Sequence, residues 1–158
     1  MSIRIYTDGS AKGNPGPGGY GIVLLSDEGH RKEVTKGYRK TTNNRMELLS
    51  VIIALEMLKS RPMEVVVYSD SKYVVDAVEK KWVFNWEKKC FKKKKNVDLW
   101  KRFLIVYRQH NVKIVWVKGH ANNAENERCD KLAVSAAEAK EHHDIDRGYE
   151  NLQLNRYE

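Results

Sequence analysis

The chain of 158 residues carries 29 basic and 21 acidic residues and has a mean hydropathy of −0.66, and its length favours one domain with a substantial core. It contains no apolar run of 18 residues and no apolar signal segment at its start, so we expect neither a membrane span nor export. Two cysteines, Cys90 and Cys129, are too few for a disulfide framework, which favours a cytoplasmic location.

The first part of the chain predicts three strands followed by a helix. Strands are expected over residues 2–8, 20–25 and 32–39, and the short links between them favour an antiparallel meander. The segment 9–19 is rich in Gly, Asn and Pro, which predicts a long turn. Apolar residues at helical spacing predict a helix over 44–58 that ends before Pro62.

The remaining elements alternate between strand and helix. We expect strands over 64–68 and 112–117, and helices over 71–78, 97–109 and 125–140. Strands separated by helices imply right-handed crossovers and parallel pairing. The sequence therefore predicts an α/β fold with a mixed five-stranded sheet flanked by helices. Residues 1–140 are expected to form the domain, and the polar tail 141–158 is typical of a mobile segment.

The net charge of +8 is concentrated in one segment, residues 80–96, which we call the basic arm. Between residues 80 and 95 there are eight lysines and one acid, whereas the rest of the chain is nearly balanced. Four aromatic residues interleave with these lysines: Trp82, Phe84, Trp86 and Phe91. Ammonium groups beside aromatic faces favour binding of a nucleic acid over a merely solubilising loop.

Four carboxylates lie at the ends of predicted strands or within predicted helices, where the fold could bring them together. Asp8 and Asp70 follow apolar runs, Glu47 lies early in the helix 44–58, and Asp130 lies in the last helix. Each alone has a structural explanation: a turn at Asp8, a capping box from Asn44 to Glu47, a helix cap at Asp70, and an exposed helix residue at Asp130. Together they predict a metal site, since ligands collect beyond strand ends and clustered carboxylates suit Mg²⁺ or Mn²⁺.

Five motifs, in order and with compatible spacing, resemble bacterial type 1 ribonuclease H between residues 3 and 139. The motifs are Tyr6-Thr7-Asp8-Gly9-Ser10 with the glycine-rich stretch 13–19, Thr41-Thr42-Asn43-Asn44-Arg45-Met46-Glu47-Leu48, Tyr68-Ser69-Asp70-Ser71, Asn96-Val97-Asp98-Leu99-Trp100, and Val117-Lys118-Gly119-His120-Ala121 with Glu125-Asn126-Glu127-Arg128-Cys129-Asp130. The resemblance implies a ribonuclease H-like fold. It also implies an endonuclease that hydrolyses the RNA strand of RNA–DNA hybrids, leaves 5′-phosphate and 3′-hydroxyl ends, and removes RNA primers and hybrids during DNA replication and repair.

The resemblance also assigns catalytic positions. Asp8, Glu47, Asp70 and Asp130 match the family's metal-binding carboxylates, which implies two Mg²⁺ ions, with Mn²⁺ as a substitute, and Asp8 as the bridging ligand. His120 matches a histidine of a mobile loop that moves a proton or helps the product leave. On the residue alone, an idle exposed side chain would be the ordinary expectation for a loop histidine. His110 and Cys129 are expected to be structural.

The resemblance further implies an RNA–DNA hybrid as partner of a monomeric protein. Asn14, Asn43 and Asn44 match the family's minor-groove residues, and Trp82 matches its sugar-packing aromatic. The family's DNA-phosphate pocket is matched by Lys40, Thr42 and Asn96. Added phosphate contacts are expected from six lysines of the basic arm: Lys88, Lys89, Lys92, Lys93, Lys94 and Lys95.

Some positions depart from the family pattern. Lys72 stands where glutamine is common, Ala11 stands where cysteine or serine is common, the loop 122–124 lacks the usual Gly-His-Pro, and the arm is short. Two other functions are open: a binding module with a decayed site, and a different nuclease or strand-transfer enzyme on the same fold. The complete carboxylate set argues against the first. The basic arm and the segment 42–47 argue against the second.

Overall fold

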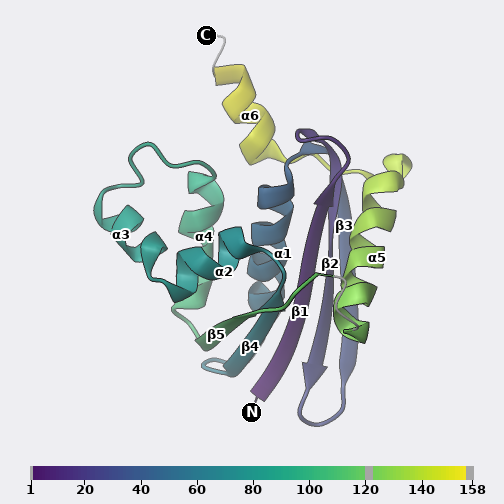
Figure 1. Ribbon diagram of the computed structural model, residues 1–158, viewed down its shortest axis with the longest axis vertical. Helices are drawn as coiled ribbons and strands as arrows, with labels where there is room; N and C mark the ends of the chain where they lie inside the picture. Colours follow the sequence, from purple (N-terminus) through teal and green to yellow (C-terminus); the bar gives the residue numbers. More distant parts are fainter. Residues whose placement is uncertain (1, 120–122, 156–158) are drawn as a thin grey trace.

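The computed structural model describes residues 2–119 and 123–155, which form a sheet with helices on both faces (Figure 1). The five strands lie in the order β3-β2-β1-β4-β5. β1 to β3 form an antiparallel meander, and β4 and β5 extend it in parallel. The predicted mixed sheet is confirmed. The strands are β1 (Ser2–Ala11), β2 (Gly16–Ser26), β3 (Arg31–Thr41), β4 (Glu64–Ser69) and β5 (Asn111–Trp116).

One face of the sheet is covered by α5, and the other by α1 with α2 to α4 beyond it (Figure 1). The helices are α1 (Asn43–Glu56), α2 (Lys72–Glu79), α3 (Trp82–Lys88), α4 (Val97–Tyr107), α5 (Ala124–Glu138) and α6 (Arg147–Asn155), with a 3₁₀ turn η1 (Lys140–His142). The sequence did not predict α3 or α6, because α3 is a seven-residue helix within the lysine-rich arm and α6 lies in the polar C-terminal segment. None of the helices in the described ranges combines the length and apolarity that a bilayer span requires.

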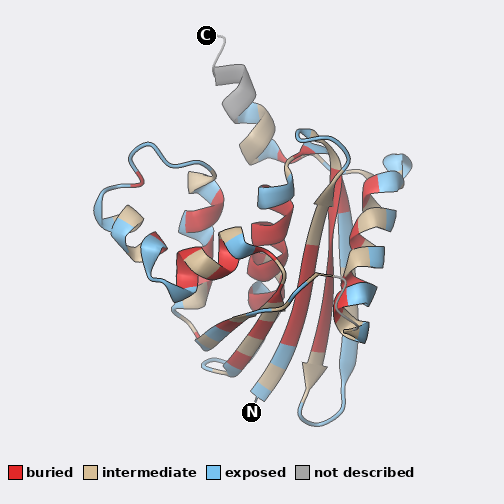
Figure 2. Ribbon diagram, in the orientation of Figure 1, coloured by how far each residue is buried: buried red, intermediate tan, exposed pale blue. Residues whose placement is uncertain are grey.

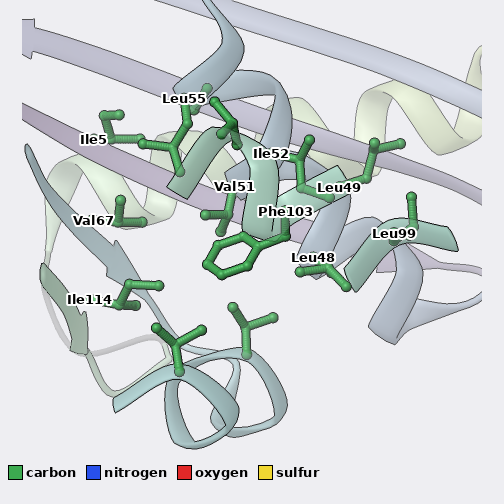
Figure 3. Packing of buried hydrophobic residues seen from close by; sticks show 14 of the residues in the cluster. Ile5, Leu48, Leu49, Val51, Ile52, Leu55, Val67, Leu99, Phe103 and Ile114 are labelled. Atoms are coloured by element: carbon green, nitrogen blue, oxygen red, sulfur yellow. The ribbon is translucent and has the colours of Figure 1, made fainter. Parts of the chain in front are cut away.

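The core is built around α1, which is buried on most of its surface between the sheet and α4 (Figure 2). Its apolar residues point in nearly every direction, as in helices with neighbours on all sides. Ile52 and Leu55 of α1 belong to one buried cluster with Ile5 and Val67 of the sheet and Phe103 of α4 (Figure 3). Each such side chain stabilises the fold by about 1.5–3 kcal/mol. This packing holds α1 rigidly against β1.

The glycine-rich segment after Asp8 is mostly strand, so the predicted turn over 9–19 is wrong. β1 continues to Ala11, pairing with β2 as far as Gly18, and only residues 12–15 connect the two strands. The glycines of β2 serve close packing instead. A Cβ on Gly21 would overlap the carbonyl oxygen of Cys129 in α5. The absent side chains let α5 lie directly on the sheet.

The aromatic residues of the basic arm make a small core of their own. Trp86 packs edge-on against Trp100 of α4 with ring centroids 5.7 Å apart, Phe84 packs against the same helix, and Phe91 is buried. Trp82 remains 45% exposed. Of the four arm aromatics, only Trp82 is therefore freely available to a ligand.

Candidate active site

Asp8 and Asp70 are brought level by the pairing of β1 with β4. Tyr6 lies opposite Tyr68 in the last pair of these parallel strands. Each aspartate lies two residues further along the chain. Beyond this pair β1 continues only along β2, so the two strands separate where the carboxylates emerge. A gap at the carboxyl ends of parallel strands is a usual place for a ligand in α/β proteins.

Glu47 reaches this gap from α1, and Gly9 makes the approach possible. The helix is capped by Thr42, whose Oγ1 accepts the Arg45 N–H at 3.2 Å. The predicted capping box from Asn44 to Glu47 is wrong, because the Glu47 carboxylate accepts the N–H of Gly9 on β1 instead. A Cβ on Gly9 would overlap the backbone of Glu47. The missing side chain therefore lets α1 carry Glu47 to β1.

The three carboxylates meet. One ligand oxygen from each of Asp8, Glu47 and Asp70 lies within 4.8 Å of the others. Asp130 lines the same pocket from α5. Its neighbour Cys129 is buried, with Sγ 3.2 Å from the carbonyl oxygen of Tyr6, and this contact ties α5 to β1 near Asp8. All four predicted carboxylates therefore line one pocket, and Cys129 has the packing role that was predicted.

Burial and mutual repulsion disfavour the charged forms of this cluster. Asp8 is 5% exposed and Glu47 is 9% exposed. Burial raises the pKa of Asp8 to about 7, and the negative charges of Asp70 and Asp130 add to the increase. Burial and the charge of Asp8 hold the pKa of Glu47 well above its usual range. A divalent cation would relieve this repulsion, and hard oxygen donors at this spacing fit Mg²⁺ or Mn²⁺. The donor set therefore fits a metal.

Lys72 places a positive charge at the rim of this acidic pocket. Among the described residues that line the pocket it is the one cation. Its Nζ lies 4.1 Å from the centroid of the Trp116 ring, and the indole N–H of Trp116 donates to the carbonyl oxygen of Asp70 at 3.3 Å. Lys72 was recognised in the sequence only as a departure from the family. His120 lies outside the described residues.

A second pocket, with a volume of about 510 Å³, adjoins the acidic one at Asn44, which lines both. Two of the three predicted phosphate-binding residues, Thr42 and Asn96, line it. Lys40, the third, is exposed on β3 and does not line it. The lysines at this pocket come from the basic arm instead, as Lys94 and Lys95.

The three predicted minor-groove asparagines lie at or between the two pockets. Asn14 lines the second pocket, Asn43 lines the acidic one, and Asn44 lines both. Asn43 also joins the strand ends, since its N–H donates to Asn14 Oδ1 at 3.1 Å and its Oδ1 accepts the Ala11 N–H at 2.6 Å. The predicted alternative role as helix cap belongs to Thr42.

Some lining residues were not predicted. Tyr73 lines the acidic pocket, and its hydroxyl oxygen accepts from Asn96 Nδ2 at 3.0 Å and from Trp100 Nε1 at 2.8 Å. A tyrosine within a helix carries no sequence signal for this role. The C-terminal residues Gly148 and Tyr149 line the second pocket, although the sequence placed them in a tail.

Comparison with known proteins agrees with the geometry. Residues 1–138 match the family model described as RNase H. A ribonuclease H of Desulforamulus reducens is 55% identical over 140 residues, which cover 85% of this chain and 87% of that protein.

Among solved structures, LC9-RNase H1, a type 1 RNase H, is 34% identical with a TM-score of 0.78, over 96% of this chain and 80% of that one. LC11-RNase H1 in complex with an RNA/DNA hybrid is 28% identical with a TM-score of 0.68, over 86% of this chain and 96% of that one. The family match spans both the fold and the four carboxylates, and the relatives share most of their length with this chain. The chain belongs to the ribonuclease H family, among the bacterial type 1 enzymes.

Proposed function

We propose that this enzyme hydrolyses the RNA strand of RNA–DNA hybrids and uses Mg²⁺ to do so. The observation that carries the proposal is the meeting of Asp8, Glu47 and Asp70 within 4.8 Å at the end of two parallel strands. The hybrid bound in the related LC11-RNase H1 structure supports the substrate class.

Four carboxylates are proposed to hold two metal ions: Asp8, Glu47, Asp70 and Asp130. When bound, such ions supply an activated water and stabilise the charge on the leaving 3′ oxygen. The contribution of the protein is to hold the oxygens in place before the substrate arrives. Asp8 lies within a strand and Glu47 within a buried helix, so neither backbone can move without disturbing the core.

The two adjoining pockets suggest how a hybrid lies on the protein. A phosphate of the RNA strand would lie at the acidic pocket, and a phosphate of the DNA strand at the pocket lined by Thr42 and Asn96. Between them Asn14, Asn43 and Asn44 present amides, which both donate and accept and therefore suit the base edges and 2′-hydroxyls of a minor groove.

The basic arm is proposed to extend this surface. The exposed ring of Trp82 would pack on a DNA sugar. Lysines 88, 89 and 92–95 would add phosphate contacts without sequence preference, and Lys40 would act near the DNA strand. Proton transfer by His120, a monomeric state, a cytoplasmic location and a role in replication and repair stay predictions from the sequence.

One assay tests the proposal directly. Labelled RNA–DNA hybrid, duplex RNA and duplex DNA are incubated with the enzyme, with Mg²⁺ and with a chelator. We expect cleavage of the hybrid alone, in its RNA strand, and only with Mg²⁺. The variant Asp8→Asn should lose cleavage and keep hybrid binding. Cleavage in the chelator, or unchanged turnover by Asp8→Asn, would contradict the metal-dependent mechanism.

A further inference from the structure

The C-terminal segment 144–150 is attached to β3 and α1 at several points. The N–H of Asp144 donates to the carbonyl oxygen of Gly37 at 2.9 Å, and its own carbonyl accepts the Arg39 N–H at 3.0 Å. The Arg39 side chain also holds Glu150 through two hydrogen bonds, of 2.9 and 2.8 Å. This segment lies beyond the residues that match the family model, which ends at residue 138.

Arg45 joins this segment to two helices. It is 1% exposed, and each of the five N–H donors of a guanidinium has an acceptor here. Two hydrogen bonds go to Asp146, at 2.8 and 3.0 Å, and two go to Asp98, at 2.9 and 2.7 Å. The fifth goes to Asn96 Oδ1 at 3.3 Å. The beginnings of α1 and α4 and the C-terminal segment are therefore fixed to one buried side chain.

The same three elements line the second pocket. Thr42 stands at the start of α1, Asn96 at the start of α4, and Tyr149 at the start of α6, with Lys94 and Lys95 also at the pocket. Helix N-termini and ammonium groups both attract an anion. The negative charge of Asp98, which also lines the pocket, is directed to Arg45.

Gly148 allows α6 to come this close. A Cβ at that position would overlap the Asp98 carboxylate and would lie 2.7 Å from Nη2 of Arg45. Tyr149 takes part in the anchoring only through its backbone N–H, which donates to Asp146 Oδ1 at 3.3 Å. Its hydroxyl has no hydrogen-bond partner among the residues that the structure describes.

We infer that the C-terminal segment completes the pocket for the DNA strand, with Tyr149 as a further residue that contacts the DNA backbone. Its hydroxyl donates to a phosphate oxygen, and Asp146 is a positioning residue that holds α6 in place through Arg45. This inference rests on the proposed hybrid cleavage. Because the anchor uses only the backbone of Tyr149, the side chain can be changed without removing the anchor.

The test uses the full chain and compares Tyr149→Phe, Tyr149→Ala and Thr42→Ala. The matched control is Tyr107→Phe, which removes a hydroxyl from the core side of α4, away from both pockets. Steady-state cleavage of a hybrid is measured. We expect KM to rise by about tenfold or more in Tyr149→Phe, because one hydrogen bond to a charged phosphate is removed, with kcat and melting temperature unchanged.

A second measurement locates the contact. The DNA strand is made with one neutral methylphosphonate, moved one position at a time. We expect wild-type KM to rise when the substitution lies at the phosphate in the pocket. At that position the increase in KM should be smaller for Tyr149→Phe and for Thr42→Ala than for the wild type, because each variant already lacks one contact to that phosphate. The increase for Tyr107→Phe should equal that of the wild type.

The outcomes separate this inference from the proposed function. If the wild type does not cleave hybrid, the proposed function fails. Suppose that the wild type cleaves hybrid and that Thr42→Ala shows the smaller increase in KM at the substituted phosphate. If Tyr149→Phe and Tyr149→Ala do not show it, the inference about the C-terminal segment is overturned. A lower melting temperature of the Tyr149 variants with unchanged KM would also overturn it, since the segment would then only stabilise the fold.

Discussion

Without metal, the carboxylate cluster should destabilise the enzyme as the pH rises. A carboxyl with a raised folded pKa binds its proton more tightly in the folded state. Folding is therefore favoured while the group is protonated, and the advantage is lost as the pH rises through the folded pKa. Burial raises the pKa of Asp8 to about 7. An unfolded aspartate titrates near pH 3.9, so the loss falls between about pH 4 and pH 7.

The size of the effect follows from this interval. A difference of about three pKa units corresponds to about 4 kcal/mol, which is a large part of a typical stability of about 5–15 kcal/mol. Asp8→Asn removes both the titration and one repelling charge beside Glu47. In a chelator at pH 8 the variant should therefore be more stable than the wild type, by up to about 4 kcal/mol, and near pH 4 the two should be nearly equal.

The measurement is urea unfolding of both proteins in a chelator from pH 4 to pH 8. Burial and the charge of Arg61 lower the pKa of His110, which gives a pH dependence of the opposite sign. Because His110 is present in both proteins, its effect cancels in their difference. Saturating Mg²⁺ should then stabilise the wild type, by about 2.7 kcal/mol at a hundredfold excess over Kd, and the variant less. A stability difference that does not change with pH would refute the reasoning.

Three further predictions concern packing and charge. Gly9→Ala should displace Glu47, so that activity and Mg²⁺-induced stabilisation both fall; full activity with an unchanged metal response in calorimetry would contradict the role of Gly9. Arg45→Met should lower the free energy of unfolding by about 3 kcal/mol, because Asp146 would be left without its buried partner, and urea titration would show whether it does. Neutralising lysines 92–95 should weaken hybrid binding. The slope of log K against log salt concentration should become shallower by about one for each phosphate that is no longer neutralised. An unaltered slope would mean that these lysines do not touch the hybrid.

The elements that could be predicted from the sequence are those with a local signal. The apolar spacing of residues 44–58 marks α1, and the β-branched run 64–68 marks β4, because burial on a helix or in a central strand imposes these patterns. The glycines of β2 were misread for a physical reason. The same absence of a side chain permits a turn and permits a helix to lie on a strand, and only the position of α5 decides between them.

The residues of the candidate site likewise divide into those that have a local signal in the sequence and those that do not. Asp8 and Asp70 could be identified because both follow apolar runs that predict strands, and ligands collect beyond strand ends, although neither carboxylate is distinctive alone. The role of Asp146 depends on Arg45, which lies 101 residues away in the chain. Arg45 lies within a motif that resembles the family, but nothing in the sequence around either residue indicates that the two pair. A hydrogen-bonded pair at that separation has no periodicity and no short motif. Such a pair can be identified only in the folded structure, where β3, α1 and the C-terminal segment lie together.

The two pockets also differ in what holds them. The acidic pocket depends on carboxylates that repel one another, so the rest of the fold must stabilise it until a cation binds. The second pocket is held by the attraction of Arg45 for two carboxylates, those of Asp98 and Asp146, so its elements are joined without a metal. Asn44 belongs to both pockets and stands in the first turn of α1, the helix that carries both Glu47 and Arg45. Because α1 is buried against the sheet, its packing sets the spacing between the acidic pocket and the second pocket. If the proposed function holds, we expect a hybrid whose strands match that spacing to be favoured.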